Sequence, residues 1–212
     1  MKKMTRALVT LLVLVLPGTP GLASAQSPAP PPDPIAAFVS ATQEYAVLHR
    51  RIERQLPSFE INAKPETIRR LVDAMANAIR AARPDAHQGD FFTPALAAEL
   101  RLRIYDALTE HGLTSEDIRF AEWLDGINPS TARLAVNDAF PWALGSAMFP
   151  CVTAALPPLP PELQYRVVGN TLVLIDIHAS LIVDLLPHAL VESTATDLDC
   201  GIFRGSAKNP RR

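Results

Sequence analysis

Hydrophobic residues recur at helical spacing through the first half of the chain. The clearest case lies between Pro65 and Pro84, where apolar positions fall at i, i+3, i+4, i+7, i+11 and i+14, the spacing of one helix face. Proline fits the first turn of a helix and stops its continuation, so the two prolines mark the ends. The pattern predicts an amphipathic helix with arginines on its polar face. Its apolar residues are Ile68, Leu71, Val72, Met75, Ile79 and Ala82.

Three further helices are predicted around this one. An aspartate–proline pair opens residues 34–56, and a threonine–proline pair opens residues 94–111; both pairs are typical of helix starts. Gly112 ends the second of these, because glycine readily adopts the left-handed conformation that follows a helix. A short helix begins at Ser115 and ends near Gly126.

The last third of the chain has the pattern of β-strands. Residues 165–168 and 172–175 are rich in β-branched and aliphatic side chains and are separated by Gly169-Asn170, a pair that suits a two-residue hairpin turn. A second reversal returns residues 181–183 antiparallel to the second strand. We therefore expect an α+β domain, in which about four N-terminal amphipathic helices pack on a small C-terminal antiparallel β-meander.

The first 25 residues have the layout of a signal peptide. Three cations, Lys2, Lys3 and Arg6, precede an apolar run at residues 7–16. Ala23-Ser24-Ala25 then supplies the small-x-small pattern that a signal peptidase recognises. Ten apolar residues cover roughly half of a ~30 Å hydrocarbon core, so a retained membrane helix is not expected. The sequence predicts cleavage after Ala25 and export, either to a periplasm or to the medium.

The predicted organisation has four parts. A signal peptide at 1–25 precedes a proline-rich spacer at 26–33, a single α+β domain at 34–192 and a polar tail at 193–212, which we expect to be disordered. No apolar run after residue 25 approaches 18 residues, so no membrane span is expected there.

Charge and motifs exclude several function classes. The formal net charge is −2, and removal of the three cations of the signal peptide makes it −5, which offers no basic surface for a nucleic-acid backbone. The sequence contains no P-loop, dinucleotide fingerprint, EF-hand loop or HExxH motif. We therefore expect neither a nucleic-acid partner nor an organic cofactor.

Two cysteines, Cys151 and Cys200, would meet an oxidising compartment after export. A disulfide between them would close a loop of about 50 residues and stabilise the fold by ~3–4 kcal/mol. The alternative is a buried Cys151 and a free Cys200 in the polar tail.

The best candidate for a metal site lies in the predicted meander. Asp176 and His178 would share one strand face, and Asp184 follows across the reversal, so that an imidazole and two carboxylates could meet. The simpler interpretation is that these residues occupy strand ends and turns, where aspartate and histidine are ordinary.

Two other segments contain residue types used in catalysis. His87 and Asp90 could form an acid–base pair, although Gly89 between them also suits a turn whose following aromatic pair anchors the next helix. Gly145-Ser146 places a serine after a glycine but lacks the second glycine of a nucleophile elbow. Close packing at the glycine is the simpler explanation there.

Three stretches resemble segments of a group of exported bacterial proteins to which no activity is assigned. They are residues 82–94 (ARPDAHQGDFFTP), residues 140–142 (FPW) and residues 156–184 (LPPLPPELQYRVVGNTLVLIDIHASLIVD). The similarity extends over roughly residues 60–190. It implies an exported domain in which the loop at Gln88-Gly89-Asp90 (the QGD loop) and the final hairpins belong to one unit, and it implies no site residue.

The sequence favours a non-catalytic, exported domain that contacts an envelope protein or a glycan. The candidate contact surface is the polar face of the 65–84 helix, with Arg69, Arg70 and Arg80, and Trp123 and Trp142 are candidate anchors. The alternative is an envelope hydrolase or metal-dependent enzyme that uses the Asp176, His178 and Asp184 cluster. A structural accessory of the envelope is the third hypothesis.

Overall fold

The structure, a computed structural model, describes residues 33–58, 64–120 and 132–190. The predicted signal peptide, the polar tail and most of the proline-rich spacer lie outside these ranges. Trp123 and Cys200 also lie outside them.

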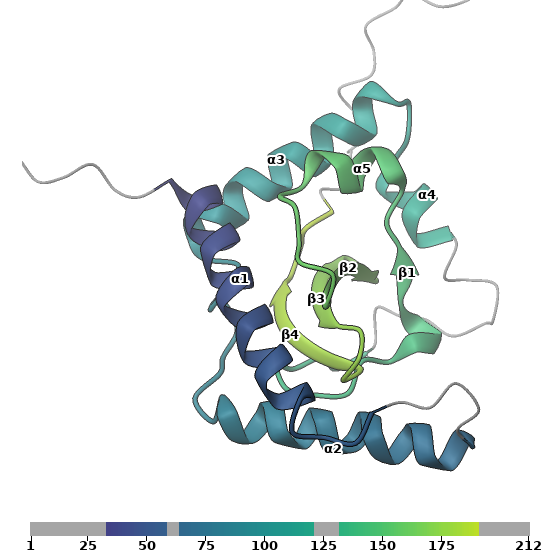
Figure 1. Ribbon diagram of the computed structural model, residues 1–212. Coiled ribbons are helices and arrows are strands. Elements are labelled where there is room, and N and C mark those ends of the chain that lie inside the picture. Colours follow the sequence, from purple (N-terminus) through teal and green to yellow (C-terminus); the bar gives the residue numbers. More distant parts are fainter. Residues whose placement is uncertain (1–32, 59–63, 121–131, 191–212) are drawn as a thin grey trace, which may run out of the picture. The chain divides into compact units, whose positions relative to one another are not determined.

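The four predicted helices are present (Figure 1). They are α1 (Pro34–Glu53), α2 (Pro65–Ala82), α3 (Pro94–Glu110) and α4 (Ser115–Phe120). The Asp33 side chain accepts a hydrogen bond from the Ile35 backbone N–H, and Thr93 caps α3 in the same way, which satisfies N–H groups that have no partner inside a helix. A fifth helix, α5 (Pro150–Ala155), was not predicted.

The C-terminal half forms a four-stranded antiparallel sheet in the order β1-β2-β3-β4. Its strands are β1 (Ser146–Ala147), β2 (Leu163–Val168), β3 (Thr171–Asp176) and β4 (Leu181–Leu186). The predicted three-stranded meander corresponds to β2, β3 and β4, and the short β1 extends it at one edge. Gly169 and Ser180 have positive φ values of 59° and 53° in the two reversals. The chain is therefore an α+β protein, as the sequence predicts.

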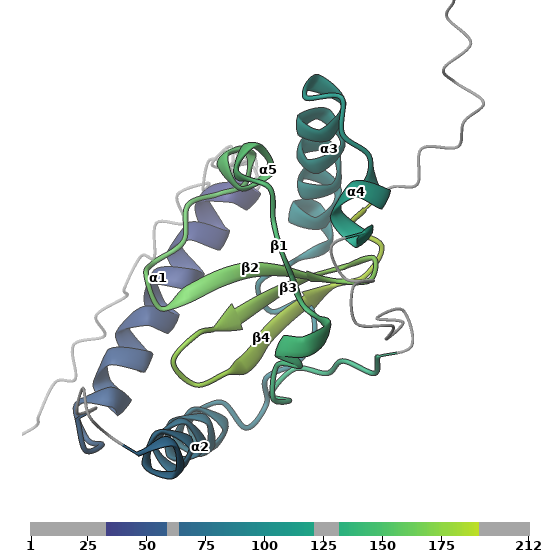
Figure 2. The ribbon, with the colours of Figure 1, turned by 90° about the vertical axis from the view of Figure 1, so that its right-hand side faces the viewer.

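Both faces of the sheet are buried. On one face, side chains such as Tyr165 and Leu174 pack with apolar residues of α1, α2 and α3, and Figure 2 shows these helices surrounding that side of the strands, with α2 close to the β3–β4 turn. On the other face, Val173 and Ile182 pack with Phe140 and its neighbours in residues 132–144. Within the described ranges, no helix has the length and hydrophobicity that a bilayer span requires.

Gly145 is the close-packing position that the sequence suggested. A Cβ atom at this residue would lie 2.3 Å from Cζ of Phe140, the buried ring that packs under the sheet. We expect Gly145→Ala to lower the free energy of unfolding by about 1–3 kcal/mol, because the added methyl displaces this ring. Urea denaturation measures the change. In a Phe140→Ala background the cost should fall sharply, and an undiminished cost would contradict the assignment to this contact.

Candidate metal centre

Three chemically active side chains lie on one face of α1. Tyr45, His49 and Glu53 are spaced four residues apart, so they follow one another along the helix towards its C-terminal end. Tyr45 and His49 are buried, whereas the Glu53 side chain is half-exposed. The face thus runs from the core to the solvent.

Asp176, the last residue of β3, is a buried carboxylate with four donors. Its Oδ2 accepts hydrogen bonds from Oη of Tyr45 at 2.8 Å and from Nδ1 of His49 at 2.6 Å. Its Oδ1 accepts the backbone N–H groups of His178 at 3.0 Å and Ala179 at 2.9 Å. Four donors compensate the cost of burying this side chain, and they tie α1 to the β3–β4 turn.

The Tyr45 hydroxyl remains a donor in this cluster. Burial, followed by the charge of Asp176 and the hydrogen bond to it, raises the pKa of Tyr45 well above its usual value, although the positive charge of Arg83 opposes the shift. Arg83 lies over the Tyr45 ring at 5.3 Å from its centroid. The Tyr45 hydroxyl is therefore protonated at neutral pH and donates its proton to Asp176.

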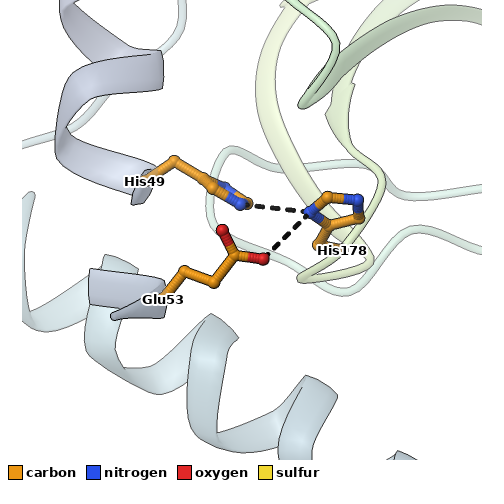
Figure 3. Close-up of side chains that lie close together, drawn as sticks. All are labelled: His49, Glu53 and His178. Atoms are coloured by element: carbon orange, nitrogen blue, oxygen red, sulfur yellow. Dashed lines mark hydrogen bonds and ion pairs between the residues drawn. The ribbon is translucent and has the colours of Figure 1, made fainter. Parts of the chain in front are cut away.

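The carboxylate of Asp176 sets the tautomer of His49. Because Asp176 can only accept, the neutral imidazole carries its proton on Nδ1 and leaves a lone pair on Nε2. That Nε2 lies 3.2 Å from Nδ1 of His178, and Nδ1 of His178 lies 3.8 Å from Oε1 of Glu53 (Figure 3). The ligand atoms of His49, Glu53 and His178 all lie within 4.8 Å of one another.

This spacing fits a divalent transition metal. Nitrogen ligands of a tetrahedral zinc ion, at about 2.0–2.1 Å from the metal, lie about 3.3–3.4 Å apart. The 3.2 Å separation of the two imidazole nitrogens is close to this value. The Glu53 oxygen lies further away, at 3.8 Å from Nδ1 of His178 and within 4.8 Å of the His49 ligand atom. The Glu53 side chain is half-exposed, so a change of its rotamer can close these distances. A buried carboxylate behind one imidazole is also the usual support for a metal-bound histidine.

A cleft of about 490 Å³ opens beside these ligands. Glu53 and His178 form part of its wall, together with the apolar side chains of Leu71 and Met75 from α2. Among the residues that the structure describes, Arg54, Leu56, Pro57 and Ser58 complete its lining. A ligand in this cleft would lie directly against the histidine and carboxylate groups.

Of the three residues predicted as a metal site, the structure brings only Asp176 and His178 together. Asp184 instead receives four backbone N–H groups: Gly89 at 2.9 Å and Leu185 at 2.7 Å on Oδ1, and Phe91 at 2.8 Å and Phe92 at 2.7 Å on Oδ2. A shift in the β3–β4 register lies next to it. Asp184 therefore anchors the QGD loop to β4, and the two segments belong to one folded unit.

His87 and Asp90 do form a pair, but they form it within this same loop. Nδ1 of His87 lies 2.8 Å from Oδ1 of Asp90, and the His87 side chain is 76% exposed. Asp90 also accepts the His87 backbone N–H, and Gly89 has a φ of 94°. Phe91 and Phe92 are buried in the core, which agrees with the interpretation as a turn and an aromatic anchor.

The arginines of α2 differ in their contacts. Arg80 donates to the backbone carbonyl of Asn137 at 2.7 Å and to the Asn77 side chain at 2.9 Å, so it helps to hold the fold. Arg70 bonds within its own helix, to Thr67, while Arg69 is exposed. As a contact surface, this face therefore depends mainly on Arg69 and Arg70.

Two further predicted features are partly visible. Trp142 is 46% exposed and packs edge-on against Phe140, with Arg166 over its ring. Cys151 is a half-buried residue of α5 that has no disulfide partner within the described ranges. Because Cys200 lies outside the described residues, the disulfide between them stays a prediction.

His49, Glu53 and Tyr45 are absent from the site residues predicted from sequence. The four-residue spacing of these side chains on one predicted helix was the available signal. Their link to Asp176 spans 127 residues in the case of His49, and no local pattern shows a contact over that separation.

Comparison of the chain with protein-family models, with curated proteins and with solved structures finds no match.

Proposed function

We propose that this chain is a metal-dependent hydrolase in which Nε2 of His49, Nδ1 of His178 and the carboxylate of Glu53 hold a divalent transition metal such as Zn²⁺. The observation that supports it most strongly is the 3.2 Å separation of the two imidazole nitrogens behind the buried Asp176 carboxylate. Two histidines and a glutamate are a known ligand set of catalytic zinc, which keeps its fourth position for water.

The ligand set and the cleft together support catalysis over a purely structural metal. A zinc ion held by His49, His178 and Glu53 would lower the pKa of a bound water to about 7 and so would supply hydroxide at neutral pH. In the hydrolysis of a carbonyl compound, water adds to the carbonyl carbon, the bond to the leaving group breaks, and one water proton passes to the leaving group. The cleft beside Glu53 and His178 offers space for such a substrate.

This proposal follows the alternative hypothesis drawn from the sequence, that of a metal-dependent enzyme, but it assigns the metal to different ligands. His49 and Glu53 replace Asp184 as partners of His178, and Asp176 becomes the support of His49. The layout of residues 1–25 supports export, so we expect the proposed activity to occur outside the cytoplasm. The interaction hypothesis relied on the arginines of α2, and one of these, Arg80, is already engaged in the fold.

The purified protein should bind one zinc ion per chain. His178→Ala should weaken zinc affinity at least 100-fold, because it removes one of three ligands. The His178 side chain is 47% exposed, so this change should leave the fold intact. His87→Ala is the matched control, since His87 is also an exposed histidine but lies outside the cluster. Calorimetric titration with zinc and elemental analysis measure both variants.

A wild-type chain that binds no zinc, cobalt or nickel at neutral pH would contradict the proposal. Asp176, His49 and His178 would then form only a hydrogen-bonded chain. Equal zinc affinities for His178→Ala and the wild type would also contradict it, because the metal would lie elsewhere.

A further inference from the structure

We infer that the substrate of this site carries an apolar group, an alkyl or aryl chain, attached to the carbonyl that is hydrolysed. This inference rests on the proposed function and specifies its substrate class. It follows from the chemistry of the cleft wall.

Two kinds of side chain line the cleft. Glu53 and His178 contribute polar groups, as do Arg54 and Ser58. Leu56, Leu71 and Met75 contribute aliphatic and thioether groups. A substrate whose carbonyl lies beside Glu53 and His178 can therefore place the attached chain against apolar side chains.

The size of the cleft is suitable for a small-molecule substrate. Its volume of about 490 Å³ lies within the range of small-molecule sites, which is roughly 300–1,000 Å³. Such sites bind mainly through apolar contact and use a few polar groups to orient the ligand. Here the metal ligands would orient the carbonyl, and the wall of Leu71 and Met75 would select the chain attached to it.

The apolar wall also predicts how affinity depends on chain length. Transfer of one methylene from water to an apolar surface corresponds to about a fourfold gain in affinity when the group is fully buried. The Leu71 side chain is half-buried and Met75 is buried, so the wall is fixed by the fold. We expect a gain of about threefold per methylene until the chain reaches the end of the cleft.

Alkyl hydroxamates test the inference directly, because the hydroxamate group binds zinc and the alkyl chain varies independently. The zinc-loaded full chain is titrated calorimetrically with acetohydroxamate, butanohydroxamate and hexanohydroxamate. Affinity should rise about 80-fold from the first to the third compound, at threefold for each of four methylenes.

Two variants of α2 test whether the Leu71 side chain causes the dependence of affinity on chain length. Leu71→Gln should remove most of the gain for hexanohydroxamate and leave acetohydroxamate binding unchanged. Ile68→Gln is the matched control, because Ile68 lies on the same helix, is 41% exposed and does not line the cleft. It should retain the full dependence on chain length.

The possible failures are distinguishable. Equal affinities across the series, or the same loss in Ile68→Gln as in Leu71→Gln, would overturn the inference about the substrate and leave the metal site intact. A chain that binds neither zinc nor acetohydroxamate would overturn the proposed function itself, and the inference with it.

Discussion

Replacement of Asp184 by alanine should lower the free energy of unfolding by roughly 4 kcal/mol or more. The side chain is fully buried, and its two oxygens accept the backbone N–H groups of Gly89, Phe91, Phe92 and Leu185. Each buried donor left without a partner costs about 1–3 kcal/mol. Because a whole domain is stable by only about 5–15 kcal/mol, the variant should be close to unfolding at 37 °C.

Urea denaturation of the purified variants measures this effect, and Asp85→Ala provides the matched control. Asp85 lies in the segment between α2 and the QGD loop, but its side chain is exposed, so its loss should change the free energy of unfolding by less than about 0.5 kcal/mol. Similar values for the two variants would show that the Asp184 hydrogen bonds do not hold the loop. Asp184→Asn should lie between them, since an amide keeps one acceptor oxygen.

The secondary structure could be predicted largely because its signals are local. The 65–84 segment combines a helical period with a proline at each end, and α2 begins at the first of these prolines. The turn at Gly169-Asn170 likewise follows from residue types that suit a hairpin. The short strand β1 could not be predicted, because two residues carry no periodicity and pair with β2 only after the sheet exists.

The candidate site was harder to predict because it depends on contacts between distant segments. Asp176 and Asp184 look alike in sequence: each is an aspartate in an apolar segment of the meander. In the structure, one receives side-chain donors from α1 and the other receives backbone donors from the QGD loop. Only the packing of helix and loop against the sheet distinguishes Asp176, the partner of the proposed ligand His49, from Asp184, which anchors a loop.

His49 is a second residue whose place in the candidate site could not be predicted from the sequence. It lies beside Arg50 and Arg51 near the end of a helix, where basic residues commonly interact with the helix dipole. The spacing to Glu53 places both side chains on one face, but the third ligand, His178, comes from a turn 129 residues away. The side chains of the site therefore come together only when the sheet packs on α1, and the sequence alone does not show this contact.

Asp176→Asn should reduce zinc affinity at least 100-fold while it preserves the shape of the side chain. The carboxamide oxygen can still accept the N–H groups of the β3–β4 turn, which leaves the amide nitrogen facing His49. An amide N–H would then donate to Nδ1 of His49 and move the ring proton to Nε2, the nitrogen that the metal requires. Loss of a supporting carboxylate typically costs 10–100-fold in metal affinity, and the wrong tautomer increases the cost.

Tyr45→Phe separates this electronic effect from a general loosening of the cluster. It removes one of the donors to Asp176 but keeps the carboxylate and the proton on Nδ1 of His49, so zinc affinity should change by less than about tenfold. Zinc titration gives the affinities, and ¹⁵N NMR of the metal-free proteins reports the His49 tautomer. Asp176→Asn should show the proton on Nε2, whereas the wild type and Tyr45→Phe should show it on Nδ1. An unchanged tautomer in Asp176→Asn, with zinc affinity lost, would contradict the tautomer mechanism and would mean that Asp176 acts through its negative charge alone.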